Sequence, residues 1–127
     1  MARTTADWHV FRGLGMLGLM ACLWPVTLAI AQAPPEPAQV ILHLLDYMAV
    51  DYPQCVQDGT VLDQSEYDEQ VEFSQQVRTL LDQLPAHSSR SSLLSQTEQL
   101  VALIQDKRPG PEVSALAHQL RWHIIRA

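Results

Sequence analysis

Residues 43–52, HLLDYMAVDY, place reactive polar side chains in an otherwise apolar stretch. These side chains are His43, Asp46, Tyr47, Asp51 and Tyr52. Carboxylate oxygens and imidazole nitrogens are ligands that iron and other transition metals accept. The same groups also dock basic partners, cap helix ends or lie at the edge of a helical core. Which use applies depends on the helix face that carries each side chain.

Four amphipathic helices are predicted to position these side chains. Their ranges are 37–51, 63–84, 91–107 and 111–126. Each range has one apolar stripe at α-helical spacing, and no stretch shows the alternation of a β-strand. Four such helices with short connections predict an all-α fold, an antiparallel four-helix bundle.

Local signals mark the helix ends. Tyr52 precedes Pro53, which disfavours helical geometry and predicts that the first helix ends there. Asp63 and Glu66 have the spacing of a capping box at the start of the second helix. Pro111 fits the first turn of the fourth helix, where a missing N–H costs nothing.

A helical wheel separates HLLDYMAVDY into faces. With Ile41 on the core side, His43 and Asp46 point away from the core and are close enough to approach each other. Tyr47 and Asp51 lie on the flank of the core. The carboxylates of Asp46 and Asp51 therefore cannot chelate one ion from a single straight helix.

On the second helix, Glu66 is predicted to be the most inward acid, and Glu69 lies at the edge of the apolar stripe. Two uses of Glu66 stay open. It completes the capping box, or it binds a metal inside the bundle with groups from another helix. The candidate metal ligands are Asp51, Glu66, Glu69 and His43, with Asp46 and Tyr47 in support.

The fourth helix carries a second, partly apolar face opposite its core stripe. This face consists of His118, Trp122 and Ile125. A face of this kind either covers a partner or is an ordinary exposed surface. It is the candidate partner-binding surface, as an alternative to the outward face of His43 and Asp46.

The N-terminal region has the pattern of an export signal. A basic start, an apolar stretch from Gly13 to Ile30 and an A-x-A end predict a cleaved signal peptide, 1–31. The alternative is an uncleaved membrane anchor, because 18 apolar or small residues are marginally long enough to span a bilayer. Either places the rest in the periplasm, if the source is bacterial.

Removal of the leader leaves a proline-rich lead-in, 32–39, and a helical domain, 40–127. Cys55 is then the only cysteine, so an internal disulfide is excluded. A lone exported thiol is either reactive toward another chain or a small buried side chain.

Charge is spread unevenly along the chain. Residues 32–72 contain nine acids and no base, whereas residues 73–127 contain four acids and six bases, so the mature chain carries −9 + 2 = −7. Such a balance argues against nucleic acid as a partner and favours cations or a basic partner. No haem motif and no nucleophile in a recognisable setting is present, so the sequence does not predict an enzyme.

The stretch HLLDYMAVDYPQCVQDGTVLDQSEYDEQVEF, 43–73, resembles the exported N-terminal region of bacterial high-affinity iron permeases of the oxidase-dependent iron transporter family. The matching elements are H-L-L-D-Y, V-D-Y-P, D-G-x-V, E-Y-x-E and E-F, followed by A-L-A-H-x-L-R-W at 115–122. In that family a helical periplasmic segment precedes a seven-helix permease, in some members with a cytochrome c domain between them.

The resemblance implies a role beside iron transport, in which the domain gathers iron or docks to the membrane permease or its cytochrome c partner. The alternatives are an interaction module without metal, or a truncated fragment of a larger permease. The R-E-x-x-E motifs of the permease's iron path are absent, and Cys55 stands where a small residue such as alanine is expected. Iron is the implied ligand, and the oligomeric state is not predicted.

Overall fold

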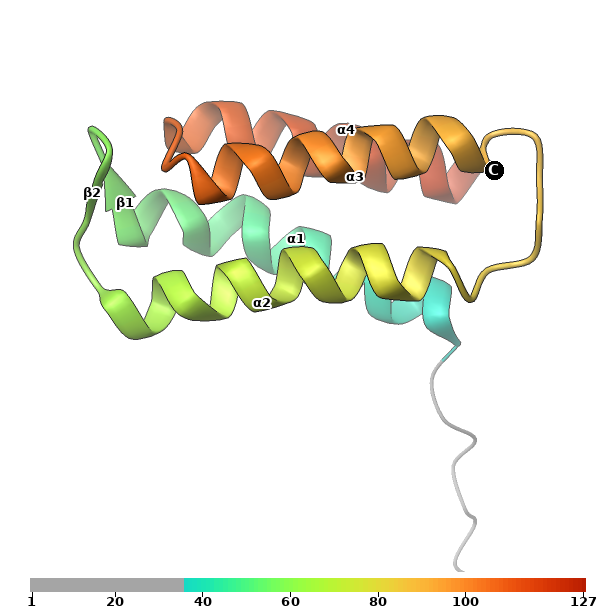
Figure 1. Cartoon of the computed structure of the whole chain (residues 1–127), viewed down its shortest axis with the longest axis horizontal. Helices are drawn as coiled ribbons and strands as arrows, with labels where there is room; N and C mark the ends of the chain where they lie inside the picture. Colours follow the sequence, from blue (N-terminus) through green and yellow to red (C-terminus); the bar gives the residue numbers. More distant parts are fainter. Residues whose placement is uncertain (1–35) are drawn as a thin grey trace, which may run out of the picture. The chain divides into compact units, whose positions relative to one another are not determined.

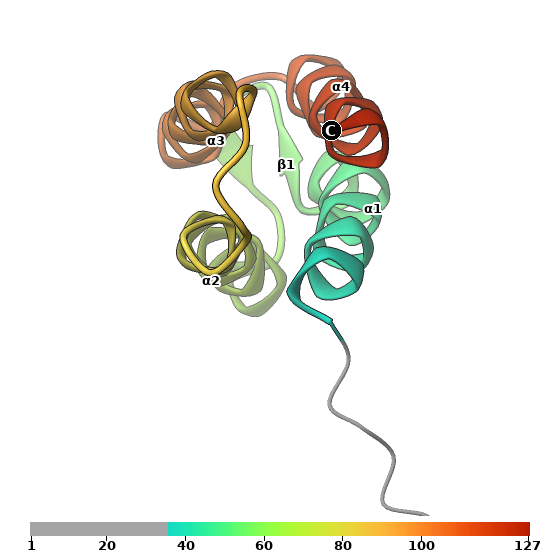
Figure 2. The same cartoon turned by 90° about the vertical axis from the view of Figure 1, so that its right-hand side faces the viewer.

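Four antiparallel helices surround one apolar core in the computed structural model, which describes residues 36–127 (Figure 1). In chain order the elements are α1 (Pro37–Cys55), β1 (Val56–Gln57), β2 (Thr60–Val61), α2 (Gln64–Leu81), α3 (Arg90–Gln105) and α4 (Gly110–Arg126). Seen end-on, the helices occupy the four corners of a square (Figure 2). The predicted four-helix bundle is confirmed, whereas the predicted signal peptide lies outside the described residues.

The core belongs entirely to the compact unit Ala33–Ala127, called the helical unit below. All four helices contribute buried apolar side chains to it, for example Ile41, Leu81, Leu100 and Leu120. Because every core residue among the described residues 36–127 belongs to this unit, the helical unit should fold by itself. Among the described residues, no helix is both long and apolar enough to cross a bilayer.

The predicted helices are correct in number and order, but two of their ends are wrong by more than two residues. Helix α1 begins at Pro37, so the last three residues of the predicted lead-in are helical, and it continues past Tyr52 to Cys55. Helix α2 ends at Leu81 rather than at residue 84, because a turn separates it from Pro85.

Pro53 lies inside α1, where the sequence predicted that the helix ends. Proline has no N–H, so the carbonyl of Ala49 loses its usual intrahelical donor. The hydroxyl of Ser114 on α4 donates to this carbonyl at 2.6 Å and replaces the missing bond. Gly110, the first residue of α4, lets the backbone lie against the Pro53 ring, because a Cβ there would be 2.6 Å from Pro53 Cβ.

A small β-hairpin, absent from the predicted elements, connects α1 to α2. Strands β1 and β2 pair antiparallel with Val56 opposite Val61. The turn residues Asp58 and Gly59 both have positive φ, 50° and 74°, as a two-residue type I′ turn requires. Strands of two residues are too short to show alternation, so only the Asp-Gly pair signals this hairpin in the sequence.

Two buried tyrosines satisfy backbone carbonyls where α3 ends and the chain turns into α4. The Tyr52 hydroxyl donates to the Arg108 carbonyl at 2.8 Å, and the Tyr67 hydroxyl donates to the Ile104 carbonyl at 3.0 Å. Carbonyls at a helix C-terminus lack their usual i+4 donor, so the tyrosine hydroxyls supply hydrogen bonds there, and the Ile104 carbonyl also accepts the Lys107 N–H at 3.0 Å. Lys107, which has a positive φ of 51°, places its ammonium 5.5 Å from the centre of the Tyr67 ring.

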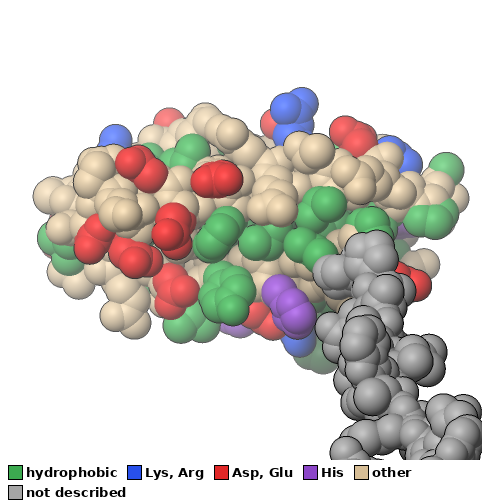
Figure 3. Space-filling model, turned by 90° about the horizontal axis from the view of Figure 1, so that it is seen from below, with side chains coloured by type: hydrophobic (Ala, Val, Ile, Leu, Met, Phe, Trp, Pro, Cys, Tyr) green, Lys and Arg blue, Asp and Glu red, His purple; other side chains and the backbone are tan. Residues whose placement is uncertain are grey.

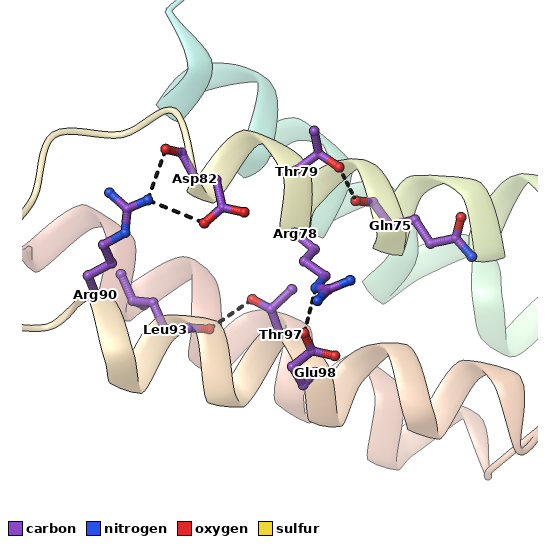
Figure 4. A network of polar contacts seen from close by, with 8 residues as sticks. All are labelled: Gln75, Arg78, Thr79, Asp82, Arg90, Leu93, Thr97 and Glu98. Atoms are coloured by element: carbon purple, nitrogen blue, oxygen red, sulfur yellow. Dashed lines mark hydrogen bonds and ion pairs between the residues drawn. The ribbon is translucent and has the colours of Figure 1, made fainter.

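Polar contacts connect α2 to α3 on the surface of the bundle (Figure 4). Arg90, at the start of α3, donates to the Asp82 and Leu84 carbonyls at the end of α2, both at 2.9 Å. Arg78 of α2 pairs with Glu98 of α3. Because the Arg78–Glu98 side chains are more than half exposed, that pair orients the helices more than it stabilises them.

The Tyr52→Phe substitution should lower the free energy of unfolding of the helical unit by about 1 kcal/mol, because the Arg108 carbonyl loses its donor. Burial raises the pKa of Tyr52 from 10.0 to about 12. The native state therefore favours the neutral phenol, and this stabilisation is complete below about pH 10 and lost as the pH rises toward 12. Urea unfolding between pH 8 and 12 measures both effects.

Tyr47→Phe is the matched control for this experiment, because the Tyr47 side chain is 57% exposed. It should leave both the stability and its alkaline decline unchanged. The Tyr52→Phe variant should lose stability less steeply at high pH, with a residual decline from Tyr67, whose pKa is also raised by burial. If the Tyr52→Phe variant is as stable as the parent at pH 8 and loses stability with rising pH in the same way, the hydrogen bond from Tyr52 to the Arg108 carbonyl does not stabilise the fold.

The Gly110→Ala substitution should destabilise the helical unit by about 1–3 kcal/mol, because the new methyl group overlaps the Pro53 ring. Helix propensity alone predicts the opposite sign, since alanine is the better helix former. Thermal melts by circular dichroism distinguish the two effects. Gln119→Ala, at an exposed site on the same helix, is the control and should not lower the melting temperature. A Gly110→Ala variant that melts at or above the parent would exclude a tight contact.

Candidate functional site

The four candidate metal ligands do not meet in one site. Glu66 and Glu69 are exposed on α2, His43 is exposed on α1, and Asp51 is half-buried on α1. Across residues 36–127 there is no group of three or more His, Cys, Asp or Glu side chains that could hold a metal ion.

The predicted inward position of Glu66 is wrong. Asp63 is the N-cap of α2, and its side chain accepts the Glu66 N–H at 3.1 Å, so this part of the capping box is confirmed. Glu66 thus lies in the first turn, at the end of the bundle. The inward positions beside it are taken by Tyr67 and Gln70, which are buried, and Glu66 projects into solvent.

Asp46 pairs with α4 rather than with His43. Its Oδ1 lies 2.9 Å from Arg121 Nε. Both side chains are partly exposed, and the N–H is not aligned for a hydrogen bond, so the contact is an ion pair of modest strength. The approach of His43 and Asp46 that the helical wheel allowed is therefore replaced by an interhelical contact.

The outer face of α1 holds an open hollow of about 440 Å³. Its lining residues all come from the HLLDYMAVDY stretch and are His43, Asp46, Tyr47, Val50 and Asp51. Two of them are exposed apolar side chains, Tyr47 at 57% and Val50 at 60%. The helical wheel assigned these side chains to two separate faces. In the structure, side chains from both faces line the same hollow.

Helix α2 extends this surface. The ring of Phe73 lies 6.3 Å from that of Tyr47, centre to centre, in a tilted arrangement. Glu69 precedes Phe73 by one helical turn, so its carboxylate belongs to the same side of α2. Figure 3 shows Asp and Glu side chains gathered toward the hairpin end of the face made by α1 and α2, with apolar side chains and a histidine in its middle. We call this surface the α1 face. It consists of His43, Asp46, Tyr47, Val50 and Asp51 of α1, with Phe73 of α2 beside Tyr47.

Sequence reasoning missed Val50 and Arg121 at this surface. The available signal for Val50 was its position on the helical wheel, where a β-branched apolar residue falls about opposite the core residue Ile41. Arg121 gave no such signal, because its partner Asp46 lies on a helix distant in sequence.

The second predicted face, on α4, is exposed. Trp122 is 53% and Ile125 is 49% exposed, and His118 is also at the surface. The Arg126 guanidinium lies 5.4 Å from the centre of the Trp122 ring. We call these four residues the α4 face.

Three acids, Glu66, Asp63 and Asp51, influence the Cys55 thiol at the hairpin end. The thiol is buried and donates to the Tyr52 carbonyl at 3.3 Å. Burial raises its pKa, and the negative charges of Glu66, Asp63 and Asp51 raise it further. The acids thus surround one end of the bundle without forming a ligand set.

Residues 30–124 match the family model of the iron permease-associated 4-helix bundle domain. The chain belongs to this family. The match confirms the predicted relation to iron permeases and connects this iron permease-associated bundle to a transport system rather than to a catalytic family. No curated protein and no solved structure matches the chain.

In the folded iron permease-associated bundle, Cys55 should react with Ellman's reagent roughly a hundredfold more slowly than in urea, because the thiol is buried and its pKa is raised. Absorbance at neutral pH measures both rates on the helical unit. In a Cys55→Ala background, a Leu62→Cys variant provides an exposed thiol that should react fast in both states. Equal rates for native and unfolded Cys55 would show that the thiol is accessible, and would favour a reactive role.

Proposed function

We propose that the chain is a periplasmic interaction module of an iron-permease system, which docks a protein partner on the α1 face. The observation that carries this proposal is the open hollow with two exposed apolar side chains, Tyr47 and Val50, inside an acidic border. Exposed apolar side chains in a concave surface with a polar rim are typical of protein-binding sites. The predicted leader supports the periplasmic location.

The acidic side chains around the hollow indicate which side chains a partner must carry. Asp46 and Asp51 line the hollow, Glu69 lies on α2 one helical turn before Phe73, and no base occurs between residues 36 and 72. A partner segment with Lys or Arg beside a bulky apolar side chain complements this border and fills the hollow. A second copy of the chain, placed with the same face opposite, brings like charges together and is disfavoured. The membrane permease and its cytochrome c partner are the two candidates that the family relation supports.

A second function, the gathering of iron, is supported by the acids at the hairpin end. The pKa of the Cys55 thiol is raised by three carboxylates, those of Glu66, Asp63 and Asp51. Their negative fields therefore overlap at this end of the bundle. Overlapping negative fields raise the local concentration of cations even without a ligand set. Iron gathering of this kind requires weak, salt-sensitive binding. Pairs of side chains, rather than the whole set, then contact each ion; the set is Asp51, Glu66, Glu69 and His43.

The test of docking is co-purification of the tagged chain with an iron permease encoded in the same genome. Val50→Asp adds an acid and removes the exposed methyl groups, so the recovered permease should fall roughly tenfold, equivalent to about 1.4 kcal/mol. Leu62→Asp is the matched control, because Leu62 is 57% exposed on the hairpin side, outside the hollow. Unchanged recovery with Val50→Asp, or equal loss with Leu62→Asp, would contradict docking on the α1 face.

Titration of the helical unit with ferrous and ferric iron separates the two functions. Docking alone predicts no change of melting temperature with iron. Iron gathering predicts a rise that Glu66→Ala and Asp51→Ala reduce and that added salt weakens. A strong, salt-independent rise would contradict both versions, because it requires a preformed centre.

A further inference from the structure

Helix α4 exposes bulky side chains on the side opposite its core stripe. Its core side consists of Val113, Ala117 and Leu120, which are fully buried. The α4 face follows the helix at positions 118, 122, 125 and 126, one and two turns apart. Trp122 and Ile125 are each about half exposed on this short helical face. They do not line the α1 hollow, so the docking proposed for that hollow does not explain their exposure.

The α4 face carries one cation, Arg126, and no acid, in an acidic protein. After Glu112, α4 contains no acid, although residues 32–127 carry a net charge of −7. Two of its four basic or imidazole side chains contact other helices: Arg121 pairs with Asp46, and His123 contacts Gln96 at 2.9 Å. The other two, His118 and Arg126, belong to the α4 face.

These residue types match an anionic phospholipid surface. A tryptophan indole is amphipathic and prefers the headgroup level of a bilayer, with an aliphatic side chain beside it reaching slightly deeper. A guanidinium binds phosphate oxygens through paired N–H donors. Arg126 and Trp122 already lie together, so one helical turn offers the cation and the aromatic ring to the same headgroup region.

The position of α4 fits the proposed docking. Helices α1 and α4 lie side by side along one side of the bundle (Figure 2), joined by the Ser114–Ala49 and Arg121–Asp46 contacts. Contact of α4 with a membrane therefore leaves the adjoining α1 face near that membrane, within lateral reach of a membrane protein.

We infer that the α4 face binds the surface of anionic phospholipid bilayers, with Trp122 and Ile125 at the headgroup level and Arg126 on a lipid phosphate. The contact is peripheral and salt-sensitive, because it involves two apolar side chains and few charges. It does not depend on the proposed docking, since it concerns another helix face and another class of partner.

Trp122 is the only tryptophan of the helical unit, so its fluorescence reports directly on this face. The experiment titrates the helical unit, which lacks the apolar N-terminal stretch, with vesicles of phosphatidylethanolamine and phosphatidylglycerol at 7:3. The expected result is a blue shift of the emission and co-flotation of the protein with the vesicles. Vesicles of phosphatidylcholine alone, or 0.5 M salt, should reduce the bound fraction at least fivefold.

Two variants keep the reporter and remove the contact. Ile125→Ser and Arg126→Gln should each weaken the partition onto anionic vesicles at least threefold. The control for Ile125→Ser is Leu62→Ser, because Leu62 is an apolar side chain of similar exposure. The control for Arg126→Gln is Arg78→Gln, because Arg78 is an exposed arginine on α2. Both control variants should bind the vesicles as the parent does. Circular dichroism melts check that all four variants are folded.

Three results would overturn the inference. The first is the absence of blue shift and flotation with anionic vesicles. The second is equal binding by the parent, Ile125→Ser and Arg126→Gln proteins. The third is a concentration-dependent blue shift without lipid, together with a dimer in size-exclusion chromatography, which would assign the face to a second copy of the chain. None of these results affects the co-purification test of the α1 face.

Discussion

The contact between α1 and α4 around Pro53 determines how the rest of the bundle is arranged. The proline removes an N–H from α1, and Ser114 of α4 supplies the donor that the Ala49 carbonyl then lacks. Gly110 allows the two backbones to approach at the same point. The contact fixes the start of α4, and therefore the turn before it, whose Arg108 carbonyl accepts the Tyr52 hydroxyl. One helix-internal proline thus couples α1 to α4 and to the end of α3.

This packing decides which polar groups are free to bind partners. Tyr52 and Tyr67 carry phenols that are chemically suited to metals, yet both donate to backbone carbonyls inside the bundle. Cys55 is likewise buried and bonded to a carbonyl. The groups that stay at the surface are the acids of α1 and α2 and the exposed apolar side chains. This distribution supports the proposed docking surface, in a chain that belongs to the iron permease-associated family.

The sequence predicts the four helices well, because their apolar stripes repeat with helical spacing and tertiary packing follows the same stripes. It fails at Pro53, since the rule that proline ends a helix ignores a donor from another helix. It also fails at Glu66, because a helical wheel assumes that every turn faces the core, whereas the first turn of α2 lies at the end of the bundle. Only the Asp58-Gly59 pair signals the two-residue strands, and the Asp46–Arg121 pair depends on a contact that no local pattern encodes.

Site-specific photo-crosslinking in cells most directly tests the proposed docking of an iron-permease partner on the α1 face. A photoreactive amino acid replaces Val50 in the full chain and, separately, Leu62. We expect position 50 to capture the iron permease or its cytochrome c partner, identified by mass spectrometry, and position 62 to capture neither. Capture of the permease from position 62 alone, or from neither position, would contradict this docking.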